Sequence, residues 1–293
     1  MTQAAARTLP AHDSASLTGL AAELRGEIIR YSNYGGIPHL ASCLSCIDIL
    51  TALYFSVLRL DTKNPQWADR DRFILSKGHA APALFQVLAR RGFYPQSDMY
   101  RPDHGDGLFG EHPPTPDHLA GVEAATGSLG HGFPMGVGMA LAAHINKRDY
   151  RVFAVLGDGE CNEGSIWEAA MFASAKGLNN LTAIVDFNKW QATDRSEEVL
   201  SLSPLADKWT AFGWEAVEVD GHDINALLKL LTPVRPAGAK PLAIIAHTIK
   251  GKGVSFMEDD NNWHYRTPNE AELKKAFAEL GLPEPVISGG HHA

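Results

Sequence analysis

At 293 residues, with 45% hydrophobic and 20% charged residues, the chain has the composition of a globular protein with one large α/β domain or two small ones. Its formal net charge of −8 argues against a general binding surface for nucleic acid or for acidic membranes. We expect no apolar stretch long enough to span a bilayer. The N-terminus lacks the apolar core of a secretory signal, so we expect a cytoplasmic protein.

The first half of the chain predicts helices around one strand. Helical spacing of apolar residues predicts a helix over 17–32 and another over about 43–58, while the apolar run 71–76 predicts a strand. A further helix is predicted over 81–92, where a glycine ends it. Residues 93–130 are rich in Pro, Gly and His without periodicity, and a loop of this length in a compact domain predicts a functional segment.

Three cysteines, Cys43, Cys46 and Cys161, are too few for a disulfide framework and suit a reducing compartment. Cys43 and Cys46 form a C-x-x-C, but no second pair completes a zinc site. They are expected to be buried small side chains of the second helix.

Strands and helices alternate in the second half of the chain. Alternation implies parallel crossovers, so we expect an α/β fold, a doubly wound and mostly parallel sheet with helices on both faces. We expect a single domain over 17–283 between flexible tails at 1–16 and 284–293. The predicted strands are 150–157, 181–187, 214–220 and 241–248, and the predicted helices are 133–146, 164–177, 224–231 and 269–281.

One β-loop-α-β unit carries polar residues at both of its strand ends. Gly157-Asp158-Gly159 follows the first strand, and Asn188 follows the second. Gly-Asp-Gly alone is a common turn tripeptide. Ligands of open α/β sheets, however, bind beyond the carboxyl ends of the strands, where the glycines allow an anion to approach the backbone. Asp158 and Asn188 offer the hard oxygen ligands that suit magnesium or calcium, with a diphosphate completing the shell.

Here the sequence resembles the thiamine-diphosphate-dependent transketolase family. Gly-Asp-Gly followed at a distance by Asn is the thiamine-diphosphate motif, and GDGECNEGSIWEA (157–169) is similar to the transketolase version of it. The resemblance covers about residues 17–275 and implies the family's diphosphate-binding fold, thiamine diphosphate as cofactor, and Mg²⁺ with Ca²⁺ or Mn²⁺ as substitutes. Four more blocks match in the same order: LSKGHAAPAL (75–84), GVEAATGSLGHG (121–132), IKGKGVSFME (249–258) and NNWHYR (261–266).

The resemblance assigns roles around the Gly-Asp-Gly turn. It implies that Asp158 and Asn188 bind the metal ion, with the backbone carbonyl of Trp190 as a third ligand. Gly157 and Gly159 would adjoin the diphosphate, to which Gly159 offers its N–H.

Other matching blocks supply cofactor contacts and a ring of histidines. The resemblance implies that His79 and His264 contact the diphosphate, that Gly127 and Leu129 lie against the cofactor, and that Ile249 lines its thiazolium side. The histidines expected around the reactive carbon are His39, His79, His112 and His264. Histidine can exchange protons or stabilise an oxyanion near neutral pH, which is what cleavage of a ketose requires.

Several of the other histidines, of the 13 in the chain, are expected to be ordinary polar residues. They are His12, His118, His144, His222, His291 and His292, with His247 open to either interpretation.

Several residues depart from the family pattern or stay open. Pro38 and Ala41 replace glycines expected around His39, and His131 stands where the family usually has glutamine, so the local backbone and the donor site can differ. Glu163 fits two interpretations equally, as a carboxylate complementing the dipole at a helix start and as a residue of a subunit interface near the cofactor.

Nothing in the chain resembles the family's second domain, which grips the aminopyrimidine and supplies a glutamate. The resemblance therefore implies a separate partner subunit that carries this pyrimidine-binding domain and the catalytic glutamate. We expect a heterotetramer with two copies of each subunit, acting on ketose and aldose small molecules.

The leading hypothesis is thus the diphosphate-binding subunit of a split transketolase, a transferase that moves a two-carbon ketol unit from a ketose phosphate to an aldose. One alternative is the α subunit of a 2-oxoacid dehydrogenase or decarboxylase, a class that shares the Gly-Asp-Gly…Asn motif without these histidine blocks. Another is a non-catalytic scaffold that kept the fold.

Overall fold

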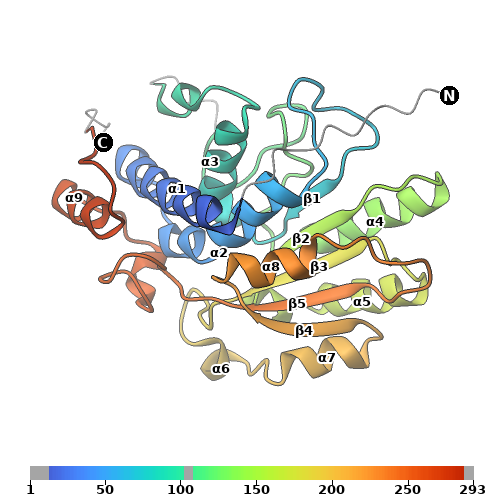
Figure 1. Ribbon diagram of the computed structural model, residues 1–293. Helices are drawn as coiled ribbons and strands as arrows, with labels where there is room; N and C mark the ends of the chain where they lie inside the picture. The colour runs from blue at the N-terminus through green and yellow to red at the C-terminus, as the bar shows by residue number, and fades with distance from the viewer. Residues whose placement is uncertain (1–12, 102–107, 287–293) are drawn as a thin grey trace.

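A parallel sheet forms the centre of the molecule (Figure 1). The computed structural model describes residues 13–101 and 108–286. Within them the sheet has five strands in the order β1-β2-β3-β5-β4, and each neighbouring pair is parallel. The expected parallel α/β sheet is therefore confirmed. The strands are β1 (Arg72–Leu75), β2 (Val152–Gly157), β3 (Leu181–Phe187), β4 (Glu215–Asp220) and β5 (Leu242–His247).

Helices cover both faces of the sheet because successive strand residues point to opposite sides. Phe153 and Val155 of β2 belong to one hydrophobic core, and Val152 and Ala154 to the other. The first core packs beneath α1 (Ser14–Gly35), α2 (Leu40–Ala52), α3 (Ala81–Arg91), α8 (Ile224–Leu231) and α9 (Glu270–Glu279). The second packs beneath α4 (Gly132–Ile145), α5 (Gly164–Ala175) and α7 (Leu205–Ala211).

Helix α2 is the central helix of the first layer. All of its residues are buried, including Cys43 and Cys46, which are free thiols as expected. It continues into the π-helical turn η1 (Leu53–Val57). The segment Leu40–Val57 is by length and composition apolar enough to cross a membrane, so the expectation that no such stretch exists was wrong. Because 94% of it is buried inside the fold and Asp48 lies within it, it is a core helix.

Element ends follow local capping chemistry. Asp13 caps α1, which begins at Ser14, inside the predicted tail 1–16. Asn269 and Glu272 form a capping box at α9. Residues 1–12 and 287–293, and with them most of both predicted tails, lie outside the described residues. Two helices between β3 and β4 were not predicted, the short α6 (Ser196–Val199) and α7.

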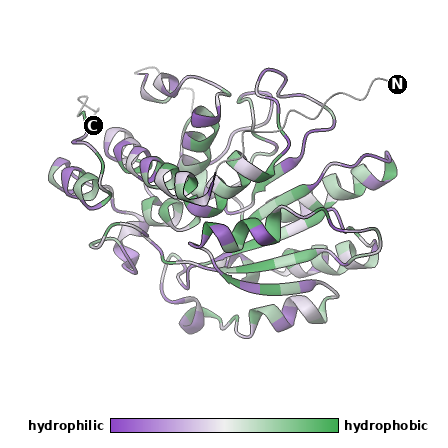
Figure 2. Cartoon of the chain, in the orientation of Figure 1, coloured by the Kyte–Doolittle hydropathy of each residue, from purple (hydrophilic) through white to green (hydrophobic). Residues whose placement is uncertain are grey.

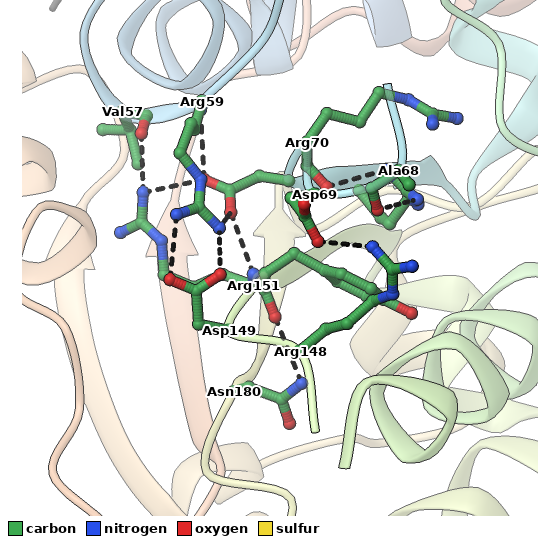
Figure 3. A network of polar contacts seen from close by, with 12 residues as sticks. Val57, Arg59, Ala68, Asp69, Arg70, Arg148, Asp149, Arg151 and Asn180 are labelled. Atoms are coloured by element: carbon green, nitrogen blue, oxygen red, sulfur yellow. Dashed lines mark hydrogen bonds and ion pairs between the residues drawn. The ribbon is translucent and has the colours of Figure 1, made fainter. Parts of the chain in front are cut away.

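A network of arginines and aspartates ties the amino ends of the strands together, opposite the edge that carries the Gly-Asp-Gly turn (Figure 3). Asp71 is 1% exposed and precedes β1. Its carboxylate accepts hydrogen bonds from the backbone N–H groups of Arg59 (3.0 Å) and Arg151 (2.9 Å) and from Arg151 Nη2 (3.0 Å). Asp149, whose side chain is 80% exposed, pairs with the same Arg59 from the solvent side. The network fixes where β1 and β2 begin.

Replacing Asp71 by Ala is expected to lower the free energy of unfolding by about 3 kcal/mol, because it leaves the backbone N–H groups of Arg59 and Arg151 without their acceptor and removes the carboxylate that faces the Arg151 side chain. The matched control is Asp149→Ala, which removes an exposed partner of Arg59 and is expected to cost less than about 1 kcal/mol. Urea unfolding of both variants measures the difference. Equal losses in the two variants would contradict this account of the network.

Candidate active site

A cavity of about 370 Å³ lies at the carboxyl ends of the strands. The Gly-Asp-Gly turn enters it from β2, and Asn188 enters it from β3, the neighbouring strand, in which Asp186 is paired with Gly157. The prediction that these strand ends are adjacent is therefore confirmed. The cavity is lined by His39, Ser42, Lys77, His79, His112, Gly127, Leu129, Gly157, Asp158, Gly159, Glu160, Asn162, Glu163, Asn188, Trp190, Gln191, Ala192 and His264.

Asp158 is a buried carboxylate at the bottom of this cavity. It is 1% exposed, and its Oδ2 accepts hydrogen bonds from the Lys189 backbone N–H (2.9 Å) and from Ser196 Oγ (2.7 Å). Burial raises its pKa to about 6, against the opposing hydrogen bond from Ser196. Its charged form thus has neutral donors and is disfavoured by burial, a setting that favours a bound cation.

Asn188 is oriented by its neighbours in the chain. Its Nδ2 donates to Asp186 Oδ2 (3.4 Å), and its Oδ1 accepts from the Trp190 backbone N–H (3.0 Å). Asp186 is itself fully buried and forms an ion pair with Lys77. Although burial raises the pKa of Asp186, the Lys77 ammonium holds it below the ordinary value. The ion pair therefore fixes the position of the Asp186 carboxylate, which in turn orients the Asn188 amide.

The residues at this end of the cavity fit an anionic group held with a hard cation. The backbone of the Gly-Asp-Gly turn lines the cavity, and a Cβ on Gly159 would lie 2.9 Å from Gln191 Cγ, so the turn is closely approached where glycine stands. Asp158, in the same turn, and Asn188 supply oxygen ligands there. Over the described ranges no group of three or more His, Cys, Asp or Glu side chains is arranged to hold a metal ion. The predicted ligand set contains one such side chain only, together with an amide and a backbone carbonyl.

Four histidines from separate segments meet at the cavity. The His39 ring centroid lies 4.9 Å from that of His264, 5.5 Å from that of His79 and 6.1 Å from that of His112. His39 precedes α2 in the left-handed region, with φ of 64°, and its backbone N–H donates to the His264 carbonyl (2.7 Å). The predicted ring of histidines is therefore assembled by the fold. The long loop 93–130 contributes His112, Gly127 and Leu129 to it.

Burial holds three of the four cavity histidines neutral, namely His39, His79 and His264. Burial lowers the pKa of His39 and places that of His79 well below its ordinary value, with Lys77 adding to the effect on His79. Burial and the nearby Lys250 ammonium lower the pKa of His264 to about 3. At neutral pH these rings are imidazoles, each with one N–H donor and one acceptor nitrogen.

Two buried lysines were overlooked as site residues, although both lie inside the matching blocks. Lys77 precedes His79 and lines the cavity. Lys250 is 1% exposed, and its Nζ contacts Asn261 Oδ1 (2.6 Å) and His264 Nδ1 (3.1 Å). Because the lysine donates to Nδ1, the proton of the His264 ring is placed on Nε2. Burial and the Lys77 charge lower the pKa of Lys250 to about 8.

Ile249 and His222 are joined by a hydrogen bond. Ile249 is not among the residues that line the cavity, and its contact with the thiazolium side of the cofactor stays a prediction. Its backbone N–H donates to His222 Nε2 (2.9 Å), while His222 Nδ1 contacts Asp48 Oδ2 (2.7 Å). His222, expected to be an ordinary residue, thus ties α2 to the segment that carries Lys250. Glu163 lines the cavity at the start of α5 and is exposed, which leaves both of its interpretations open.

Four further histidines of the described residues, namely His118, His131, His144 and His247, are not among those that line the cavity. His118, His131 and His144 are exposed, and His131 Nδ1 contacts the Leu129 carbonyl (3.1 Å). His247 Nε2 pairs with Glu218 Oε2 (2.8 Å). His12, His291 and His292 lie outside the described residues.

The family model described as transketolase, thiamine diphosphate binding domain, matches residues 29–287. The chain belongs to the transketolase family. This agrees with the motifs and with the expected fold and enzyme class. The match includes the Gly-Asp-Gly turn, Asn188 and all four histidines of the cavity.

Relatives of this transketolase-family chain differ in length. It is 40% identical over 242 residues to one subunit of the apulose-4-phosphate transketolase of Phocaeicola vulgatus, covering 83% of this chain and 85% of the relative. It is 40% identical over 250 residues to the 6-deoxy-6-sulfo-D-fructose transketolase subunit SqwG of a Clostridium species, covering 84% and 89%. Human transketolase is 38% identical over 278 residues, covering 93% of this chain and 44% of the human one.

Solved transketolases share the fold. The structure from Campylobacter jejuni matches with a TM-score of 0.84 at 29% identity, covering 95% of this chain and 44% of that one. The structure from Leishmania mexicana matches with a TM-score of 0.85 at 26% identity, covering 92% and 42%. The chain therefore spans less than half the length of these solved transketolases, but most of the length of the two bacterial relatives that are named as transketolase subunits.

Replacing Lys250 by Met is expected to change how the stability of this transketolase-family chain depends on pH. The pKa of Lys250 is about 8 in the folded chain and 10.5 ordinarily, so between these values the unfolded chain binds the extra proton. The wild type therefore gains stability relative to K250M as the pH rises through this window, by up to about 3 kcal/mol. Urea unfolding near pH 7 and near pH 10 measures the gain.

The matched control is Lys252→Met, on the same loop. The Lys252 side chain is 33% exposed, so burying its charge costs less than burying the charge of Lys250. Its removal should therefore change the pH dependence of the free energy of unfolding less. A stability difference between wild type and K250M that stays constant across the window would refute the assignment.

Proposed function

We propose that the chain is the diphosphate-binding subunit of a thiamine-diphosphate- and Mg²⁺-dependent transketolase, which transfers a two-carbon ketol unit from a ketose phosphate to an aldose in carbohydrate metabolism. The observation that carries the proposal is one cavity in which Asp158 and Asn188 at adjacent strand ends face four converging histidines. The two bacterial relatives named as transketolase subunits, which are similar over most of their length, support the same function.

Asp158, Asn188 and the carbonyl of Trp190 are the residues that would hold Mg²⁺, with Ca²⁺ or Mn²⁺ as substitutes, and Gly157 and Gly159 would adjoin the diphosphate. Thiamine diphosphate supplies, when bound, the electron sink for breaking and forming the carbon–carbon bond. The chain's own part is to bind this group, exclude water and handle protons at the sugar oxygens.

The neutral histidines suit this proton handling. Lys250 donates to His264 Nδ1, so His264 presents an Nε2–H donor that can stabilise developing negative charge on a substrate oxygen. His39 Nδ1 is buried without a hydrogen-bond partner and lies 3.9 Å from Glu111 Oε2. A neutral His39 or His79 can accept the hydroxyl proton of the donor sugar as its carbon–carbon bond breaks. His112, the most exposed of the four, stands at the mouth of the cavity.

The site is proposed to be completed by a partner subunit that carries the pyrimidine-binding domain and the catalytic glutamate. One support is that two bacterial relatives, similar over most of their own length, are named as transketolase subunits. Another is an exposed apolar surface on α4 and α5, made by Met135, Ile145, Met171 and Phe172. Figure 2 colours most of α4 in the green of hydrophobic residues. We propose a cytoplasmic heterotetramer with two copies of each subunit.

Reconstitution with the partner subunit tests the function. The purified pair, supplied with thiamine diphosphate and Mg²⁺, is expected to transfer a ketol unit from a ketose phosphate to an aldose, and to lose activity on chelation of the metal until Mg²⁺ returns. Activity on pyruvate in place of the ketose would favour a 2-oxoacid enzyme. Absence of cofactor binding by the pair would favour a scaffold.

Replacing Asp158 by Ala is expected to reduce the Mg²⁺-dependent transferase activity of the pair by more than about 100-fold, because even residues that only support a metal ligand cost about 10- to 100-fold. Asp117→Ala is the matched control, since Asp117 is exposed and does not line the cavity. Steady-state rates over a range of Mg²⁺ concentrations measure both. Wild-type rates in D158A at low Mg²⁺ would exclude Asp158 as a ligand.

A further inference from the structure

One donor atom in the cavity has no partner. The side-chain nitrogen of Gln191, Nε2, is buried and makes no hydrogen bond. Buried polar groups of folded proteins are almost always paired, so such an atom calls for a ligand or a functional explanation. Gln191 is itself one of the residues that line the cavity.

The side chain of Gln191 lies over the Gly-Asp-Gly turn. A Cβ built on Gly159 would stand 2.9 Å from Gln191 Cγ, 3.2 Å from Cδ and 3.6 Å from Oε1, so the amide group lies against this glycine. Nε2 is bonded to the same Cδ, so the unpaired donor belongs to a group that covers the Gly-Asp-Gly turn.

The backbone around Gln191 is fixed from two sides. The Gln191 N–H donates to the Asp194 carbonyl (2.8 Å), closing a turn, and the Gln191 carbonyl accepts from Lys250 Nζ (3.5 Å). Trp190 and Arg195 form an antiparallel bridge across the same turn. Because the main chain is held, the positions open to the side chain are restricted, and the donor is preorganised for a ligand in the cavity.

The chemistry of the amide selects the kind of ligand. An N–H group donates hydrogen bonds and cannot coordinate a cation, so Nε2 calls for an acceptor. The acceptor expected next to the metal ligands Asp158 and Asn188 is an anionic oxygen.

We propose that Gln191 is a further cofactor-binding residue, whose Nε2–H donates to an oxygen of the diphosphate beside Gly159. The proposal rests on the proposed function and extends it. Gln191 follows Trp190, so one short segment after β3 would contribute a metal ligand from its backbone and a diphosphate donor from the next side chain.

Binding of inorganic pyrophosphate with Mg²⁺ to the reconstituted pair of this chain and its partner subunit, followed by titration calorimetry, tests this role without requiring catalysis. Gln191→Met keeps the length of the side chain and removes the donor, so its affinity is expected to fall about tenfold, as for loss of one hydrogen bond to a charged group. Gln191→Glu replaces the donor by a negative charge and is expected to weaken binding further.

The matched control is Thr193→Glu, which adds the same charge at an exposed position of the same turn that does not line the cavity. It is expected to bind within about twofold of the wild type, because surface charges are screened by salt. Urea unfolding of each variant shows whether it folds. If Gln191→Met does not fold, the affinity of Gln191→Glu decides the test.

The outcomes separate the two proposals. Weaker binding by both Gln191 variants with normal binding by T193E supports the role of Gln191. Equal affinity of the wild type and Q191M for Mg²⁺-pyrophosphate overturns that role and leaves the proposed function standing. No binding by the wild type overturns both.

Discussion

The buried ion pair between Lys77 and Asp186 is the interaction on which the site depends. Both side chains are 0% exposed. Lys77 follows β1 and Asp186 lies in β3, so the pair spans β2, the strand that carries the Gly-Asp-Gly turn. The same carboxylate accepts hydrogen bonds from Ser45 of α2 and from Thr248 after β5. Because a buried charge is tolerated only when paired, displacing any of these elements would leave one unpaired, and their relative positions are fixed together.

This arrangement also sets the electrostatics above it. The charge of Lys77 is balanced by Asp186, whereas Lys250 places an ammonium group against the neutral His264 ring. The Lys250 charge suits an anionic cofactor, and neutral imidazoles suit proton exchange with a sugar. Asp158 supplies the one carboxylate of the predicted metal site, in a setting where burial disfavours its charge. The site thus combines attraction for a diphosphate with a local demand for a cation.

The sequence was sufficient for the parts of the site that follow from local rules. Parallel strands place their carboxyl ends at one edge, which is why the adjacency of Asp158 and Asn188 could be predicted from the β-loop-α-β unit alone. The four histidines were found because each lies in a recognisable block. The short helices α6 and α7 were missed because a stretch of four to seven residues carries too little periodicity.

Other features depend on contacts between distant residues and leave no local signal. Lys77 and Asp186 are 109 positions apart in the sequence. Each alone indicates only a charged residue at a strand end, not a buried ion pair. The link from Asp48 through His222 to Ile249 joins three separate segments. That the side-chain nitrogen of Gln191 has no partner can be seen only once its neighbours in space are known. Segment 40–57 shows the reverse case, since its composition fits a lipid environment and only the packed helices around it explain its burial.

The backbone of His39 carries a consequence for engineering. A side chain with φ of 64° is strained, and glycine would occupy that conformation more comfortably. The strain is tolerated because the His39 N–H is anchored to the His264 carbonyl. Selection for thermal tolerance alone would therefore favour losing this ring, so a library screened only for robustness would drift toward folded variants without an imidazole at this place in the cavity.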